Sequence, residues 1–199
     1  SRLADLRTRM DGYLGWDGFT SQTIAAIEIA LWDVLGRSLD TPVWQLPGGP
    51  PAATPLHGTG TTMFEESAAW HAAYFDAGVA AGIGTVKVRL GRDLEADVDV
   101  VRAVRDRVGP GIRIGVDSYW FHDARTALEV ATALAPLDIG FFEEPVPQMR
   151  VDDLAWLASR SPIPSAVGER VYSPGQSDDF GRRGPAHESP PDASACGGV

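Results

Sequence analysis

DIGFFEEPVP, residues 138–147, joins a short apolar run to two adjacent carboxylates and a proline. A short apolar run bounded by such residues is typical of a buried β-strand. Acidic side chains at the end of a buried strand need a compensating cation, because burying an unpaired carboxylate is costly. The stretch therefore predicts a strand over 138–143 whose carboxyl end holds functional carboxylates.

Runs of the same kind recur on both sides of this stretch, and longer amphipathic segments separate them. We expect further strands at 55–62, 85–90, 112–117 and 164–169, and helices at 21–36, 64–77, 93–108, 123–135 and 151–160. Strands that alternate with helices indicate a parallel sheet. The predicted fold class is α/β, as either a (β/α) barrel or an open doubly wound sheet.

Composition divides the chain into three parts. The segment 46–55, LPGGPPAATP, is dense in proline and glycine and indicates a linker. We therefore separate residues 1–50 from the strand-helix units of 51–172. Residues 173–199 contain five glycines and four prolines with few large apolar side chains, so we expect disorder there. Out-of-frame translation of GC-rich coding sequence is a second hypothesis for this tail.

The net charge indicates which partners are unfavourable, and the cysteine content indicates the cellular compartment. The 199 residues carry a formal net charge of −10, which disfavours nucleic acid and anionic membranes as partners. No apolar run is long enough for a membrane span, and residues 1–20 do not resemble a signal peptide. The single cysteine, Cys196, fits a reducing compartment, so we expect a cytoplasmic protein.

Three successive predicted strands end on a carboxylate. These residues are Asp117, Glu143 and Glu169, each 26 residues from the next. In a parallel barrel all three lie at the rim where barrel enzymes keep their active sites. Oxygen ligands without His or Cys select a hard cation, so we expect Mg²⁺, with Mn²⁺ as a substitute. The alternative is that these acids cap helices or solubilise loops.

Side-chain alternation sorts the neighbouring residues. Glu144 is expected to face away from Glu143, toward a hydrogen bond or a cation of the next loop. Lys87 and Arg89 lie two residues apart and therefore share one face, where they could hold a substrate carboxylate or move a proton. Ion pairing with the acidic rim is the alternative for both. His57, near the end of the first predicted strand, is a candidate to line the pocket.

The sequence as a whole resembles the enolase superfamily, in its mandelate racemase and muconate lactonising branch. The matching pieces are IAAIEIALWDVLGRSLDTPVWQLPGG (24–49), VKVRL (86–90), GVDSYW (115–120), FFEEPVP (141–147) and VGER (167–170). The resemblance implies that 1–50 is the C-terminal part of a capping domain and that 51–172 forms the first five units of a (β/α)₇β barrel. It also implies Mg²⁺ bound by Asp117, Glu143 and Glu169, and abstraction of the proton α to the carboxylate of a small substrate.

Two features depart from the family pattern. Lys87-Val88-Arg89 replaces the usual Lys-x-Lys, which gives Lys87 the position that contacts the substrate carboxylate and Arg89 the position of the base. Arginine is a poor proton acceptor. Tyr119 replaces a small polar residue, and we expect it to contact substrate. We read these departures as favouring an acid-sugar dehydratase, whose acid and base come from a His-Asp pair on later strands; a racemase, epimerase or cycloisomerase is the alternative.

Other classes of protein also remain open. Barrels of this kind run to roughly 250 residues, so this sequence covers a barrel only in part. A catalytically inactive remnant with an open sheet edge is one alternative, and a different barrel metalloenzyme, such as an aldolase with a divalent ion, is another. The resemblance further implies that the full-length family is commonly homo-oligomeric.

Overall fold

The computed structural model describes residues 17–48, 57–60, 65–91, 93–120, 122–183 and 192–198, together with residues 5, 9 and 15. The chain divides into two compact units. The sheet unit comprises Thr54–Val167 and Arg183–Ser189, and the helical unit comprises Ser1–Ala53, Gly168–Arg182 and Pro190–Val199.

Five parallel strands form the sheet, in the order β1-β2-β3-β4-β5. They are β1 His57–Thr59, β2 Thr85–Arg89, β3 Arg113–Asp117, β4 Ile139–Glu143 and β5 Ser165–Ala166. Sequential neighbours that pair in parallel are what successive strand-helix units produce. The predicted α/β class is confirmed, and the sheet has the strand order of part of a barrel. All five predicted strands exist; β5 is shorter than expected, and residues 55, 56, 61 and 62 of the first predicted strand lie outside the described residues.

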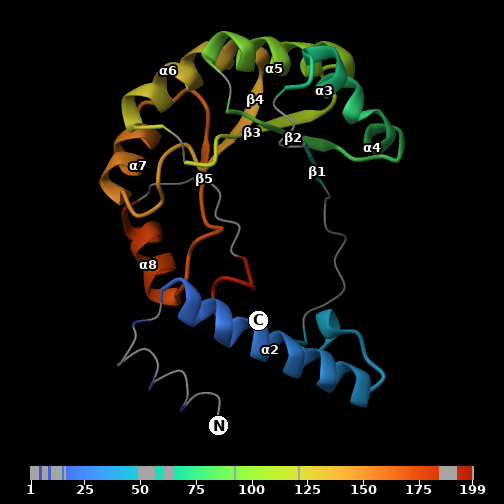
Figure 1. Ribbon diagram of the computed structural model, residues 1–199, viewed down its shortest axis with the longest axis vertical. Helices are drawn as coiled ribbons and strands as arrows, with labels where there is room; N and C mark the ends of the chain where they lie inside the picture. The colour runs from blue at the N-terminus through green and yellow to red at the C-terminus, as the bar shows by residue number, and fades with distance from the viewer. Residues whose placement is uncertain are drawn as a thin grey trace. The chain divides into compact units, whose positions relative to one another are not determined.

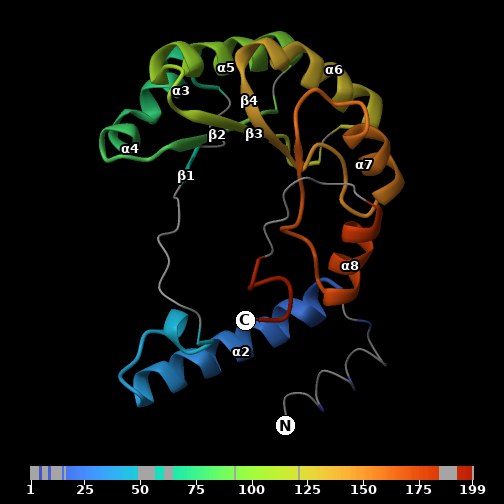
Figure 2. The same cartoon turned by 180° about the vertical axis from the view of Figure 1, so that it is seen from behind.

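Helices follow the strands and cover one face of the sheet, as Figures 1 and 2 show from opposite sides. They are α3 Ala68–Tyr74, α4 Asp76–Ala80, α5 Leu94–Val108, α6 Ala124–Leu134 and α7 Val151–Ala158, with the 3₁₀ turn η2 Ala135–Leu137 after α6. Asp93 caps α5 by accepting the Ala96 N–H, and Asp123 caps α6 by accepting the Arg125 and Thr126 N–H groups. The apolar sides of these helices and of the strands form the core.

One irregularity in β4 sets the register of the sheet. Ile114 pairs with Ile139, but the next residue of β3, Gly115, pairs with Phe141. Gly140 is thus an extra residue, as in a β-bulge. A Cβ on Gly140 would lie 2.5 Å from the Arg113 Nε, and a Cβ on Gly115 would lie 2.0 Å from the Phe141 ring. Gly115 therefore leaves space for the buried Phe141 ring, whereas a side chain at Gly140 would have to displace the exposed Arg113 side chain.

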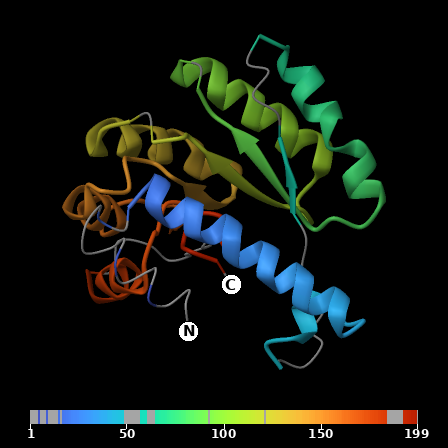
Figure 3. The same ribbon diagram turned by 60° about the horizontal axis from the view of Figure 1, so that its bottom comes forward.

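The helical unit contains the long helix α2 Phe19–Ser38, which appears blue in Figure 3, and the short turn η1 Val43–Gln45. Ser21, Ile24 and Ala25 of α2 are fully buried. The expected helix over 21–36 is therefore present and two residues longer at each end. None of the helices in the described part of the chain is long and apolar enough to cross a membrane.

The tail differs in part from the expected disorder. Helix α8 spans Pro174–Arg183, where composition predicted no regular structure. Ser173 accepts the Gln176 N–H at 3.3 Å, and the Gln176 side chain accepts the Tyr172 N–H at 2.7 Å. These bonds resemble a capping box, in which Ser and Gln three residues apart stabilise the start of a helix. Phe180 supplies a buried anchor, so a local cap and one aromatic side chain outweigh the unfavourable composition.

Candidate active site at the carboxyl ends of the strands

Residues of β2 and β3 come together because paired positions of parallel strands face the same side of a sheet. Lys87 pairs with Gly115, and Arg89 pairs with Asp117. The Arg89 Nη1 donates to the Asp117 Oδ2 at 2.5 Å. The space that a side chain on Gly115 would take is filled by the ring of Phe141, from the neighbouring strand β4. The prediction that Lys87 and Arg89 share one face beside Asp117 is confirmed.

Asp117 and Glu143 stand opposite each other on β3 and β4. The bulge at Gly140 lets β4 keep Ile139 beside Ile114 at one end and Glu143 beside Asp117 at the other. Neighbouring strands lie about 4.8 Å apart, so the two carboxylates leave adjacent backbones. Their common register, expected from the equal spacing of 26 residues, is therefore present in the structure.

The carboxylates and the cations form one buried cluster. The Lys87 Nζ donates to the Glu143 Oε1 at 2.8 Å and lies 3.2 Å from the Asp117 Oδ2. Lys87, Asp117 and Glu143 are 6%, 2% and 7% exposed, which makes mutual neutralisation necessary. The positive charges of Lys87 and Arg89 balance the negative charges of Asp117 and Glu143. The ion pairing considered as an alternative role for Lys87 and Arg89 is thus present.

Tyr119 lies over the guanidinium of Arg89. The Arg89 Cζ is 4.2 Å from the centroid of the Tyr119 ring, and the Tyr119 N–H donates to the Asp117 Oδ1 at 3.0 Å. Sequence reasoning assigned Tyr119 to the substrate and missed both contacts. An arginine as the last residue of one strand and an aromatic residue two positions after the end of the next strand form the signal that could have indicated these contacts.

Glu144 begins the loop after β4, with φ of +45°, and its side chain is 1% exposed. Its carbonyl oxygen accepts the Ser118 Oγ–H at 3.1 Å and the Trp120 N–H at 2.7 Å. Glu144 therefore ties the loops after β3 and β4 together through its backbone. That connection was not expected from the sequence, which assigned Glu144 only a side-chain contact.

Glu169 is the expected site residue that the structure places differently. Strand β5 ends at Ala166, so Glu169 follows the strand by three residues and does not terminate it. It belongs to the helical unit, where its carboxylate lies 3.7 Å from the Arg170 Nε. Within the described residues, no three His, Cys, Asp or Glu side chains are grouped as a metal site. The expected set of three carboxylates is represented in the sheet unit by a pair.

His57 is the first residue of β1 and pairs with Thr85, whereas Thr59 pairs with Lys87. Residues 55, 56, 61 and 62 of the predicted strand lie outside the described residues. A role for His57 in lining the pocket therefore stays a prediction.

The residues of the pair suit a hard cation. Asp117 and Glu143 supply only oxygen donors, which is the donor type that Mg²⁺ selects. Among the described residues, the Glu143 Oε1 has Lys87 as a partner, while the Oε2 makes no hydrogen bond. The two carboxylates stand on adjacent strands in register, so both could supply oxygen ligands to one ion.

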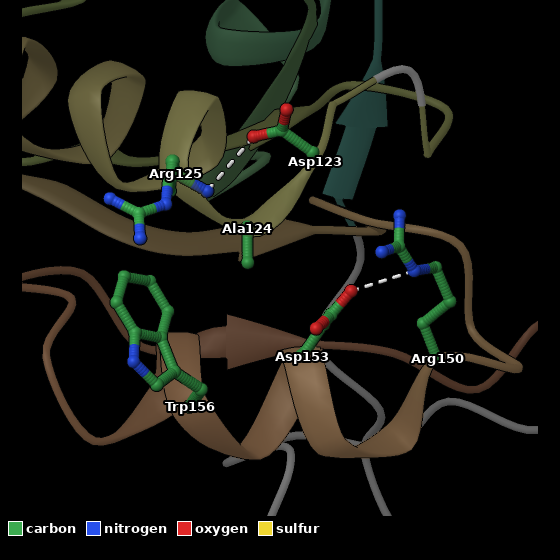
Figure 4. A pocket seen from close by; sticks show the side chains of 6 residues that line it. All are labelled: Asp123, Ala124, Arg125, Arg150, Asp153 and Trp156. Carbon is green, nitrogen blue, oxygen red and sulfur yellow. Dashed lines mark hydrogen bonds and ion pairs between the residues drawn. The ribbon is translucent and has the colours of Figure 1, made fainter.

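A cavity of about 380 Å³ lies apart from this cluster, between the starts of α6 and α7. Figure 4 shows its lining, which consists of Asp123, Ala124, Arg125, Arg150, Asp153 and Trp156. The Arg150 Nε pairs with the Asp153 Oδ2 at 2.6 Å. Hydrogen bonds from Thr126 lower the pKa of Asp123, with smaller effects from Arg125 and Arg150. The described lining includes none of the expected site residues.

Two family descriptions match the chain. Residues 1–48 match the sequence model described as mandelate racemase / muconate lactonizing enzyme, N-terminal domain. Residues 70–199 match the model described as enolase C-terminal domain-like. The second match includes residues 173–199, which the sequence alone did not connect with the family.

Individual relatives catalyse different reactions. The chain is 33% identical to a 3,6-anhydro-alpha-L-galactonate cycloisomerase from Streptomyces coelicolor, over 94% of this chain and 52% of the relative. It is 31% identical to an arabinonate dehydratase from Saccharolobus solfataricus, over 80% of this chain and 43% of the relative. The chain therefore spans about half the length of these curated relatives.

The structure is similar to that of a racemase from Streptomyces coelicolor A3(2) with bound magnesium. The TM-score is 0.90 at 31% sequence identity, and the match covers 98% of this chain and 58% of the racemase. The proteins to which this chain is similar thus include a cycloisomerase, a dehydratase and a racemase.

Proposed function

Because the chain belongs to the mandelate racemase and muconate lactonizing enzyme branch of the enolase superfamily, we propose that it serves Mg²⁺-dependent abstraction of the proton α to a carboxylate. The observation that carries the proposal is the buried cluster of Lys87, Asp117 and Glu143 at the carboxyl ends of adjacent strands. Active sites of barrel enzymes lie at this end. The substrate is a small hydroxy acid.

We propose that Asp117 and Glu143 hold Mg²⁺ within the sheet unit; Glu169 as a third ligand stays a prediction from the sequence. When bound, the ion supplies positive charge that stabilises the negative charge developing on the substrate carboxylate. The α-proton of an ionised carboxylate is very weakly acidic, so this charge needs fixed cations nearby. Lys87 and Arg89 are two such cations, held by ion pairs to Asp117.

Lys87 and Arg89 have different tasks in this proposal. Lys87, whose ammonium lies between two carboxylates, binds the substrate carboxylate. Arg89 keeps its proton, because a guanidinium is not deprotonated in proteins, and it acts as a fixed positive charge. The general acid and base are then a His-Asp pair from strands beyond those of the sheet unit.

Dehydration of an acid sugar is the finer reaction that we propose. In this reaction the proton α to the carboxylate is removed, and the hydroxyl on the β-carbon leaves as water after protonation by a general acid. Arg89 in the position of a base supports this choice, since a racemase needs proton acceptors on both faces of the substrate. The similarity to a cycloisomerase and to a racemase keeps those reactions as the second candidate.

The test is turnover of a panel of sugar acids in the presence of Mg²⁺, with product identified by mass spectrometry. We expect a dehydrated product whose formation stops when the ion is chelated. Asp117→Asn should lower the rate at least about 100-fold, because it removes a ligand charge. Asp99→Asn is the matched control, since Asp99 is exposed and pairs with Arg102 on the same helix. An unchanged rate in Asp117→Asn refutes the metal assignment.

If the wild-type chain shows no activity, the alternative of a catalytically inactive remnant is favoured. That alternative predicts no Mg²⁺ binding by calorimetry and concentration-dependent association through the sheet edges, which are β1 and β5. We further propose a cytoplasmic location and a homo-oligomeric state, with no nucleic-acid partner. Light scattering on the purified chain measures the oligomeric state directly.

A further inference from the structure

Tyr119 contacts both members of the Arg89–Asp117 ion pair. Its ring centroid lies 4.2 Å from the Arg89 Cζ, and its N–H donates to the Asp117 Oδ1 at 3.0 Å. The Arg89 Nη1 donates to the Asp117 Oδ2 at 2.5 Å. One residue thus limits the movement of a cation with its side chain and of a carboxylate with its backbone.

The backbone that brings Tyr119 to this place is unusual. Tyr119 and Trp120 have φ values of +51° and +59°, in the left-handed region that bulky residues seldom adopt. Such a conformation persists only where the surroundings impose it. It therefore needs identifiable contacts on both sides of the turn.

Hydrogen bonds to the end of β4 impose this conformation. The Trp120 N–H donates to the Glu144 carbonyl at 2.7 Å, and the Ser118 Oγ–H donates to the same carbonyl at 3.1 Å. The Ser118 N–H donates to the Glu143 carbonyl at 3.2 Å. The turn after β3 is therefore fastened to the strand that carries Glu143.

We propose that Tyr119 is a positioning residue, which holds the Arg89 guanidinium against Asp117 so that a cation stays fixed beside the site of proton abstraction. A guanidinium stacked on an aromatic face and bonded at its edge to a carboxylate has little freedom to rotate. Tyr119 thus acts through Arg89 and does not itself bind substrate. Its importance for turnover rests on the proposed function, whereas its contact with Arg89 does not.

Two substitutions separate the ring from the turn. Tyr119→Asn removes the ring but suits the left-handed backbone, because asparagine adopts this conformation more readily than other non-glycine residues. Tyr119→Phe keeps the ring and removes only the hydroxyl. Tyr119→Gly is a second ring-free variant, in which the backbone conformation is unstrained.

The first measurement is the NMR order parameter of the Arg89 Nε–Hε bond, with the resonance assigned by its loss in Arg89→Lys. We expect a value above about 0.8 in the wild type and in Tyr119→Phe, and below about 0.6 in Tyr119→Asn and Tyr119→Gly. An ordered Arg89 in the ring-free variants overturns the proposal. So does an Arg89 in Tyr119→Phe that is as mobile as in Tyr119→Asn.

The second measurement is the split between kcat and KM with Mg²⁺ and a sugar acid. Misplacing a fixed charge affects the transition state more than binding, so Tyr119→Asn should lower kcat about 10-fold and change KM less than about 2-fold. Tyr119→Phe should retain the wild-type kcat. A kcat that is unchanged in Tyr119→Asn refutes the positioning role. Absence of any turnover refutes the proposed function alone, because the order parameters still decide whether Tyr119 holds Arg89.

Discussion

Gly115 lies beneath the ring of Phe141, on the face of the sheet that carries the candidate site. A Cβ at this position would come within 2.0 Å of the ring. Gly115→Ala should therefore lower the free energy of unfolding by about 1–3 kcal/mol, the usual cost of overpacking. Urea unfolding measures the change.

Gly111→Ala is the matched control for this prediction. An added Cβ at Gly111, in the turn before the same strand, meets no atom within 4 Å. It should change the free energy of unfolding by less than about 0.5 kcal/mol. Equal effects of the two alanines would mean that the Phe141 ring moves aside without cost.

His122 should make the stability of the fold depend on pH. Burial lowers the pKa of His122, against the opposing charges of Asp97 and Asp123. The unfolded chain then binds more protons than the folded chain when the pH falls below the ordinary histidine pKa of about 6.5. Neutral His122 therefore contributes fully to the free energy of unfolding above about pH 6.5, the ordinary histidine pKa. This contribution is lost as the pH falls through the pKa of His122 in the folded chain.

The measurement is the free energy of unfolding between about pH 7.5 and pH 5.5, in the wild type and in His122→Gln. We expect the wild-type value to fall more steeply than that of the variant. Asp123, whose pKa is lowered by hydrogen bonds from Thr126, contributes at lower pH and does not distort this comparison. Parallel curves would show that His122 titrates normally.

Among the contacts between elements, Arg105 joins α5 to the segments that precede β3 and β4. Its guanidinium donates to four carbonyl oxygens, those of Gly109, Ile112, Leu137 and Asp138. Lysine cannot reproduce this planar set of donors. Arg105→Lys should lower the free energy of unfolding by about 2 kcal/mol in urea unfolding.

Arg102→Lys, one turn earlier on α5, is the control. Arg102 is exposed and pairs with Asp99 on the same helix, so its replacement should cost less than about 0.5 kcal/mol. If Arg105→Lys were equally mild, the carbonyls would have to accept bonds from water in place of the guanidinium.

Elements with strong local signals were predictable from the sequence. Asp93 as cap, a valine face and Gly109 as terminator predicted α5 at 93–108, and the structure has it at 94–108. The tail was harder, because its composition outweighed the short cap signal of Ser173 and Gln176 that starts α8. A helix cap contributes little to the free energy of folding, so its signal in one sequence is easily outweighed by the composition of the segment.

The site was predictable to the extent that strand alternation determines it. Alternation and spacing placed Lys87, Arg89, Asp117 and Glu143 on one face correctly. They could not give the length of β5, which ends three residues before Glu169, since strand ends depend on pairing with neighbours. The stacking of Tyr119 on Arg89 depends on a left-handed turn, and no sequence rule predicts that conformation for tyrosine.

At the scale of the whole molecule, stability should respond to the cation in the buried cluster. Lys87 neutralises Asp117 and Glu143, so Lys87→Met should lower the free energy of unfolding by about 3 kcal/mol. A divalent ion that binds only the folded chain offsets part of this loss. We therefore expect Mg²⁺ to stabilise Lys87→Met more than it stabilises the wild type.

Thermal unfolding at increasing Mg²⁺ concentration measures this difference. Arg102→Met removes an exposed charge and should leave the response to Mg²⁺ unchanged. An equal shift of the unfolding midpoint in Lys87→Met and in the wild type would place the ion away from Asp117 and Glu143.

Because Gly140 is an extra residue, β4 has one residue more than its pairing with β3 requires. A deletion of one residue between Ile139 and Glu143 can close the bulge and leave Glu143 opposite Asp117. Strand β3 pairs without interruption along β2, so a deletion there carries Asp117 one position out of line with Arg89 and Glu143. In proteins that evolve from this sequence, we therefore expect one-residue deletions to be tolerated in β4 and selected against in β3.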